Sequence, residues 1–185
     1  MTTSTLPLHP ILEAVVEELA RDRATLLEAA ARVPADRRAQ APAPGRWSAA
    51  QVLSHLVKVE SSSGRLFSVH ARRLREAGGP AESSTDAATV IDRFARFPLP
   101  SRARPVEAPE MVAPDDTMSF DDALLALAES RSRLLDAIGK ANGLALGTVS
   151  APHPRLGELT MYEWLLMIAR HEVRHAAQLD EIATS

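Results

Sequence analysis

The chain contains no cysteine, and only 4% of its 185 residues are aromatic. The lack of cysteine excludes disulfide bonds, zinc–thiolate sites and a cysteine nucleophile. Any thiol chemistry would therefore have to use the thiol of a substrate. The scarcity of aromatic residues, together with abundant alanine, favours closely packed helices, because strands prefer aromatic and β-branched side chains.

Long apolar runs and an excess of positive charge are also missing. No apolar run approaches the roughly 20 residues of a membrane-spanning helix, and the first residues lack the basic and apolar regions of a signal peptide. The net charge is −3, without the basic stripe that is typical of nucleic-acid binding. We therefore expect a cytoplasmic protein that binds neither a membrane nor nucleic acid. The length suits one domain over residues 1–185.

Four segments have the 3.6-residue apolar period of amphipathic helices. Capping signals open three of them, because a serine or threonine precedes an acidic residue or glutamine by three positions. Glycines or a proline follow the ends of the first three segments. These signals predict long helices over about residues 10–32, 48–78, 119–141 and 160–183.

Prolines interrupt the segment between residues 80 and 117, which leaves room for one short helix within 85–97. A connection of this length is usually functional or flexible, and we expect it to help form the wall of a pocket. Residues 144–149 could be briefly extended, but no segment has the convincing alternation of a strand. The predicted fold class is all-α: an antiparallel four-helix bundle with a long connection between the second and third helices.

The most informative pattern is the pair His171 and His175 in the last predicted helix. Residues four positions apart lie on the same face of a helix, so both imidazoles can reach one metal ion. The pair continues the apolar line of Trp164 and Ile168 and therefore points inward, where an unpaired polar group costs about 1–3 kcal/mol. Such a spacing can also arise by chance, which is the alternative.

His55 lies in the second predicted helix between Val52 and Val59, so it also points inward. A lone histidine in an apolar helix is often a hydrogen-bonded core residue, which is the alternative here. Metal ligands in a bundle come from facing helices, so His55 can complete a trio with His171 and His175. Three histidines leave one coordination position open, as in reactive rather than structural sites. Imidazole ligands suit zinc, nickel and iron.

Other polar residues near the trio have competing interpretations. Gln178 lies one turn past His175 and can hydrogen-bond to a ligand or to a metal-bound water. The alternative is a polar residue at the end of the bundle without a role at the site. Glu60 is rotated off the ligand face, and we interpret it as a solvated or interhelical partner. We expect Glu172 to be exposed. Its spacing does not fit the zincin motif, which disfavours a metalloprotease. We expect His153 and His70 to be structural or on the surface.

Two groups of arginines could bind anions or could face solvent. We interpret Arg65, Arg72 and Arg73 as a solvated face rather than as an anion site. Arg170 and Arg174 share a helix face away from the histidine line. They would either bind an anionic substrate or form surface ion pairs.

Three motifs together resemble the DinB-like superfamily. Residues 46–60, with the sequence RWSAAQVLSHLVKVE, resemble its second helix, while 153–160 and 171–178 resemble its last loop and last helix. The order and spacing of the motifs fit over nearly the whole chain, and the resemblance is weakest over 80–117. It implies a DinB/YfiT-type bundle with a three-histidine divalent metal site. Matched residue by residue, the ligands would be His55, His171 and His175.

The superfamily includes mycothiol- and bacillithiol-dependent transferases, a thiol-dependent isomerase of maleylpyruvate, a domain of iron-dependent sulfoxide synthases and candidate metal-dependent hydrolases. The resemblance thus implies an enzyme that uses a divalent metal and a low-molecular-weight thiol to attack small electrophiles. Metal-dependent hydrolysis is the second activity that the resemblance implies. A homodimer is expected by analogy. The alternative is a non-catalytic, metal-stabilised bundle that acts in dimerisation or in a stress-related interaction.

Overall fold

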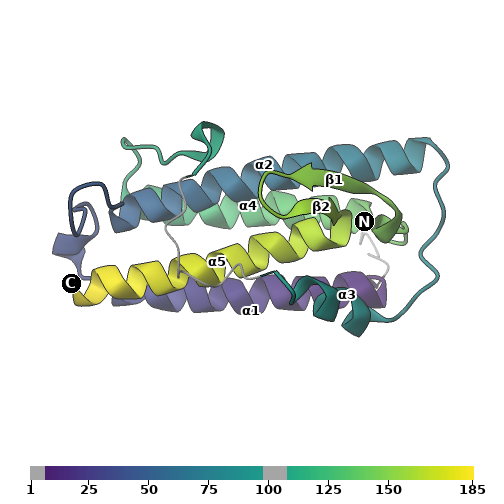
Figure 1. The fold of residues 1–185 in the computed structure, drawn as a ribbon, viewed down its shortest axis with the longest axis horizontal. Helices are drawn as coiled ribbons and strands as arrows, with labels where there is room; N and C mark the ends of the chain where they lie inside the picture. Colours follow the sequence, from purple (N-terminus) through teal and green to yellow (C-terminus); the bar gives the residue numbers. More distant parts are fainter. Residues whose placement is uncertain (1–6, 98–107) are drawn as a thin grey trace, which may run out of the picture.

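Four long helices lie alongside one another in the computed structural model, which describes residues 7–97 and 108–185 (Figure 1). The predicted long helices are confirmed, and so is a short helix within 85–97. They are α1 (Pro10–Arg32), α2 (Ala49–Glu76), α3 (Ala87–Phe94), α4 (Phe120–Lys140) and α5 (Met161–Thr184). Part of the long connection, residues 98–107, lies outside the described residues.

The predicted caps explain where three of the helices begin. The Ser48 hydroxyl accepts a hydrogen bond from the Gln51 backbone N–H at 3.2 Å, and the Gln51 side chain accepts one from the Ser48 N–H at 2.8 Å. Thr160 and Glu163 form the same reciprocal capping box at the start of α5. Each cap satisfies backbone donors that would otherwise lack a partner. The beginnings of these helices are therefore encoded locally.

The four long helices form two pairs, α1 with α5 and α2 with α4. The two helices of each pair run in the same direction, and the two pairs run in opposite directions (Figure 1). In the first pair, Arg170 of α5 forms an ion pair with Glu18 of α1, and Arg32 near the end of α1 contacts Asp180 near the end of α5. The second pair is α2 and α4. The antiparallel arrangement thus holds between the pairs and not within them. The long connection returns the chain so that α4 can run parallel to α2.

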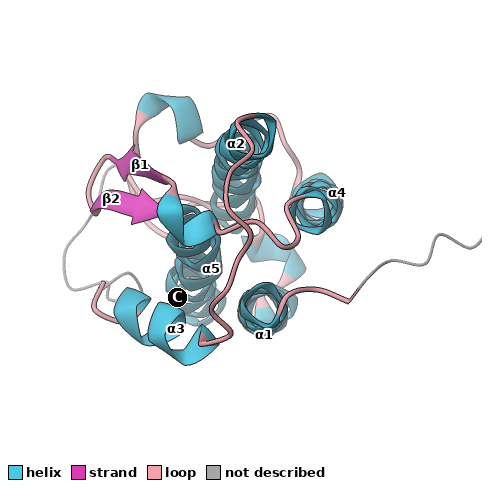
Figure 2. Cartoon of the chain, turned by 90° about the vertical axis from the view of Figure 1, so that its right-hand side faces the viewer, coloured by secondary structure: helices cyan, strands magenta, loops and turns pink. Residues whose placement is uncertain are grey.

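A two-stranded hairpin, which the all-α prediction omitted, precedes α5. The strands β1 (Ser150–His153) and β2 (Gly157–Thr160) are antiparallel, and Ala151 is paired with Leu159 in their buried centre. Residues 144–149, predicted to be briefly extended, instead contain the 3-10 turn η3 (Leu146–Thr148). Seen end-on, the hairpin and α3 lie outside the four long helices, on the side of α5 (Figure 2). The Trp164 indole ties the hairpin to α5 by donating to the Ala151 carbonyl at 3.2 Å.

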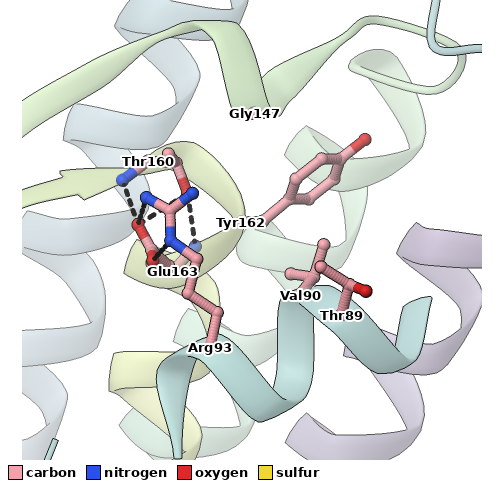
Figure 3. A pocket seen from close by; sticks show the side chains of 7 residues that line it. All are labelled: Thr89, Val90, Arg93, Gly147, Thr160, Tyr162 and Glu163. Atoms are coloured by element: carbon pink, nitrogen blue, oxygen red, sulfur yellow. Dashed lines mark hydrogen bonds and ion pairs between the residues drawn. The ribbon is translucent and has the colours of Figure 1, made fainter. Parts of the chain in front are cut away.

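The short helix α3 is attached to the first turn of α5. Arg93 of α3 contacts the Glu163 carboxylate at 2.8 Å, so this carboxylate serves the capping box and the ion pair at once (Figure 3). A cavity of about 80 Å³ beside this pair is lined by Val90 and Tyr162 among others. The Tyr162 hydroxyl lies 2.9 Å from Glu82. The cavity is far below the usual volume of a ligand pocket.

The core consists of two hydrophobic clusters separated by a polar layer. One cluster contains Leu19, Phe67 and Leu165, among other buried residues. The other contains Leu26 and Leu53 and lies at the end of the bundle that holds the C-terminus of the chain. Buried charged and histidine side chains lie between them along the helices. None of the helices in the described ranges has the length and apolarity needed to cross a membrane.

Candidate metal centre

The structure brings the three predicted histidines together within the polar layer. Their candidate ligand nitrogens all lie within 4.8 Å of one another, His55 from α2 and His171 with His175 from α5. The ring centroids of His171 and His175 are 4.6 Å apart, and that of His55 is 5.2 Å and 5.0 Å from them. The i, i+4 spacing on α5 and the facing position on α2 account for this grouping.

Hydrogen bonds set the orientation of two of the three rings. Nδ1 of His55 lies 2.7 Å from the Val112 carbonyl oxygen, which can only accept, so this nitrogen carries the proton. Nδ1 of His175 lies 2.9 Å from Oε1 of Gln178 and donates in the same way. Both rings therefore present the lone pair of Nε2. This is the tautomer that metal-binding histidines adopt when the other nitrogen is hydrogen-bonded.

The third ring lacks such a partner. Nε2 of His171 lies 3.2 Å from Nε2 of His175, while its buried Nδ1 has no hydrogen-bond partner among the described residues. In the metal-free protein, one proton on His171 Nε2 can bridge the two rings. A cation bound by the three Nε2 atoms would take the place of this proton. The donor set, three imidazoles whose Nε2 atoms can face one ion, thus fits a transition metal.

The surroundings of His171 and His55 favour the uncharged imidazole. Burial lowers the pKa of His171 well below its usual range, and the neighbouring His175, His55 and Arg174 lower it further. Burial also lowers the pKa of His55, with a smaller contribution from Lys58 and against the effect of its bond to Val112. Only the neutral ring offers a lone pair to a metal. Burial thus favours the form of His171 and His55 that can coordinate a metal.

Aromatic and backbone groups enclose the trio. The ring centroid of Trp47, just before α2, lies 4.9 Å from that of His55 and 6.3 Å from that of His175. The segment 109–116 lies along α2, where the Lys58 ammonium donates to the Ala113 carbonyl at 2.8 Å. The described part of the long connection thus supplies the carbonyl that orients His55.

A four-membered ionic cluster adjoins the histidines, and the sequence analysis did not identify it. Arg23 of α1 contacts Glu60 of α2 at 2.8 Å and Glu172 of α5 at 2.6 Å. Arg131 of α4 contacts the same two carboxylates at 2.6 Å and 2.9 Å. All four long helices thus meet in one buried, charge-balanced cluster. Each member has partners for its charge, as burial requires.

Two predictions about these carboxylates have different outcomes. The prediction that Glu172 is exposed is wrong: it is only 1% exposed, because Arg23 and Arg131 reach it from other helices. Glu60 is an interhelical partner, as one of its two interpretations held. The sequence does contain a pattern that indicates buried partners for these carboxylates. Arg23 and Arg131 each occupy an apolar stripe at helical spacing, between Leu19 and Leu26 and between Leu127 and Leu134 respectively.

Two other candidate residues have structural partners. The Arg170 guanidinium binds Glu18 and Asp22 of α1, which supports the ion-pair interpretation over an anionic substrate. His153 accepts hydrogen bonds from the backbone of the hairpin turn at Arg155, at 3.2 Å. Its ring packs against Trp164, with centroids 5.2 Å apart. The structural role expected for His153 is thus supported.

Comparison with known proteins agrees with this arrangement. The sequence profile described as the DinB superfamily matches residues 18–179. The chain belongs to the DinB superfamily. It is 27% identical over 143 residues to the uncharacterized protein YuaE of Bacillus subtilis (strain 168), a match covering 77% of this chain and 81% of YuaE.

A solved structure, that of TT2238, described as a four-helix bundle protein, shares the fold of this DinB-superfamily chain. The TM-score is 0.57 at 22% identity, and the match covers 92% of this chain and 98% of that one. The likeness concerns the fold alone at this identity. The DinB-superfamily chain is thus mostly helical, with four-helix-bundle architecture and a three-histidine cluster that could hold a metal ion.

Proposed function

We propose that this chain binds one divalent transition metal, zinc, nickel or iron, through Nε2 of His55, His171 and His175. The observation that carries the proposal is the contact between the Nε2 atoms of His171 and His175 beside the oriented His55 ring. Three imidazole nitrogens with lone pairs in one place are a ligand set for such ions. Gln178 and the Val112 carbonyl would hold two of the ligands in the required tautomer.

The reaction we propose is the transfer of a low-molecular-weight thiol, of the mycothiol or bacillithiol type, to a small electrophile. When bound, the metal would hold and activate the thiol, or a water, at the position that three protein ligands leave open. The chain's own residues would orient the ligands and exclude bulk water, with Trp47 packed beside the rings of His55 and His175. Hydrolysis by an activated water is the second possibility that this arrangement supports.

Metal analysis of untagged protein tests the binding step. We expect about one equivalent of a transition metal after reloading, and loss of it in His171→Ala. Less than roughly 0.2 equivalents in the reloaded wild type would refute the site. The variant His70→Ala is the control, because His70 lies on α2 outside the trio.

The activity of the metal-loaded protein tests the proposed thiol transfer. The protein is incubated with bacillithiol, mycothiol or glutathione and a panel of alkyl and aryl electrophiles, and with ester and amide substrates. We expect metal-dependent thiol consumption that His171→Ala abolishes. Stoichiometric metal binding without turnover in any assay would instead support the non-catalytic bundle, in which the metal serves stability alone.

A further inference from the structure

A cationic groove lies between α2 and α4, whereas the histidines lie between α2 and α5. The groove has a volume of about 660 Å³. Its floor includes small side chains such as Ala71 and Ala137. Five cationic side chains line it: Arg65, Arg72 and Arg75 from α2, and Arg133 and Lys140 from α4.

The groove follows from the order of residues on two parallel helices. Arg65, Ser68, Arg72 and Arg75 are three or four positions apart and therefore share one face of α2. Small residues at the contact allow two helices to approach closely, and the long basic side chains rise on either side of it. The result is a concave surface with an alanine floor and a cationic rim.

The charge of this groove differs from that of the rest of the chain. Its lining contains five basic side chains and a single acidic one, Asp136, and with Glu76 and Glu129, which pair with Arg72 and Arg133, the group has a net charge of +2. The whole chain has a net charge of −3. Positive charge is thus concentrated on one concave surface of an otherwise acidic protein. Such concentration raises the local density of anions.

The roles of these cations within the fold do not account for the cluster. Arg75 donates to the Lys140 carbonyl at 2.5 Å, which satisfies the C-terminal end of α4. Within residues 7–97 and 108–185, Arg72 pairs with Glu76 at 3.8 Å and Arg133 with Glu129 at 3.5 Å, each on its own helix, and exposed pairs of this kind contribute little stability. Arg65 lies well before the last turn of α2, beyond the reach of the helix dipole.

We propose that this groove binds a small anionic molecule that carries two or more phosphate groups. The planar guanidinium group matches the geometry of phosphate oxygens and forms paired hydrogen bonds with them. The volume lies in the range of small-molecule pockets, about 300–1,000 Å³. A second copy of the chain is a poor occupant, because a two-fold contact would place the same cations face to face. The site revises the interpretation of Arg65 and Arg72 as a merely solvated face.

Calorimetric titration with inorganic pyrophosphate and tripolyphosphate tests the proposal, with orthophosphate for comparison. The metal-free His171→Ala protein is used alongside the wild type, so that anion binding at the histidines does not interfere. We expect saturable binding of one pyrophosphate in both proteins, and at least tenfold weaker binding of orthophosphate. We also expect the affinity to fall as salt is raised, because the contacts are exposed.

A matched pair of double variants locates the binding. Arg65→Gln with Arg133→Gln removes two charges from the rim, and Arg73→Gln with Arg155→Gln removes two exposed charges outside it. We expect at least tenfold weaker pyrophosphate binding in the first variant and less than twofold change in the second. Equal weakening in both variants, no binding at millimolar pyrophosphate, or preferential binding of duplex RNA would each overturn the proposal.

Discussion

The Nε2 atoms of His171 and His175 lie 3.2 Å apart, and burial holds the pKa of His171 well below its ordinary value. Two neutral imidazoles can share one proton at this distance, but the Nδ1 atom of His171 then stays buried without a partner. An unsatisfied buried polar atom costs about 1–3 kcal/mol. A cation held by the three Nε2 atoms would replace this shared proton, whereas Nδ1 of His171 keeps its buried position with or without the cation.

Metal addition should raise the stability of the metal-free protein. A ligand that binds only the folded state stabilises it by about 2.7 kcal/mol at 100 times its dissociation constant. We expect zinc or nickel to raise the melting temperature of the wild type and to leave that of His171→Ala unchanged. Differential scanning calorimetry in the presence of each metal measures this. An equal increase in the two proteins would show that the stabilising metal binds elsewhere.

Gln178 should affect metal affinity although its own side chain is outside the ligand trio. Its amide oxygen accepts from His175 Nδ1 at 2.9 Å and so keeps the Nε2 lone pair available. Loss of such a partner typically weakens metal binding by about 10–100-fold. We expect this loss in Gln178→Ala and a smaller change in Gln178→Glu, which retains an acceptor. Competition with a chromophoric chelator measures the affinities, and wild-type affinity in Gln178→Ala would contradict the assigned tautomer.

The sequence features that predicted the fold act within one helix, and those that were missed act between helices. Capping boxes and apolar periodicity are local, so the four long helices could be predicted, and the histidine trio followed from two inward faces. The burial of Glu172 depends on Arg23 and Arg131, which lie far from it in the sequence. The hairpin was missed because its strands are short and its position depends on Trp164 of the following helix.

The parallel pairing of α1 with α5 and of α2 with α4 has a similar explanation. Helix periodicity identifies which face of a helix is buried, but several arrangements of four such faces bury similar apolar area. Here the ion pairs between Arg170 and Glu18 and the four-membered cluster distinguish the observed arrangement. Charged residues on otherwise apolar stripes are the part of the sequence that carries this information.

Removal of one charge from the buried cluster should strongly destabilise the protein. In Glu172→Gln, Arg23 and Arg131 would share only Glu60, which leaves an uncompensated buried charge. Breaking a buried pair in this way costs about 3–5 kcal/mol. Asp180→Asn breaks the exposed contact with Arg32 and should cost less than about 1 kcal/mol. Urea unfolding of the metal-free proteins compares them, and similar losses in both variants would show that the cluster is solvated.

Acid should destabilise the metal-free protein through its buried histidines. The pKa values of His171 and His55 are lowered by burial in the folded protein, whereas in the unfolded chain they return to about 6.5. The unfolded state therefore binds more protons as the pH falls below that value, and stability is lost. Urea unfolding at pH 8, 7, 6 and 5.5 should show a decreasing free energy of unfolding, with a smaller decrease in His171→Ala.

The pKa of Glu172 is raised by burial, so its titration changes stability in the opposite sense. Glu172 is present in both proteins, so the difference between their pH profiles isolates the histidine. Parallel pH profiles for the two proteins would mean that His171 is not held neutral by the fold.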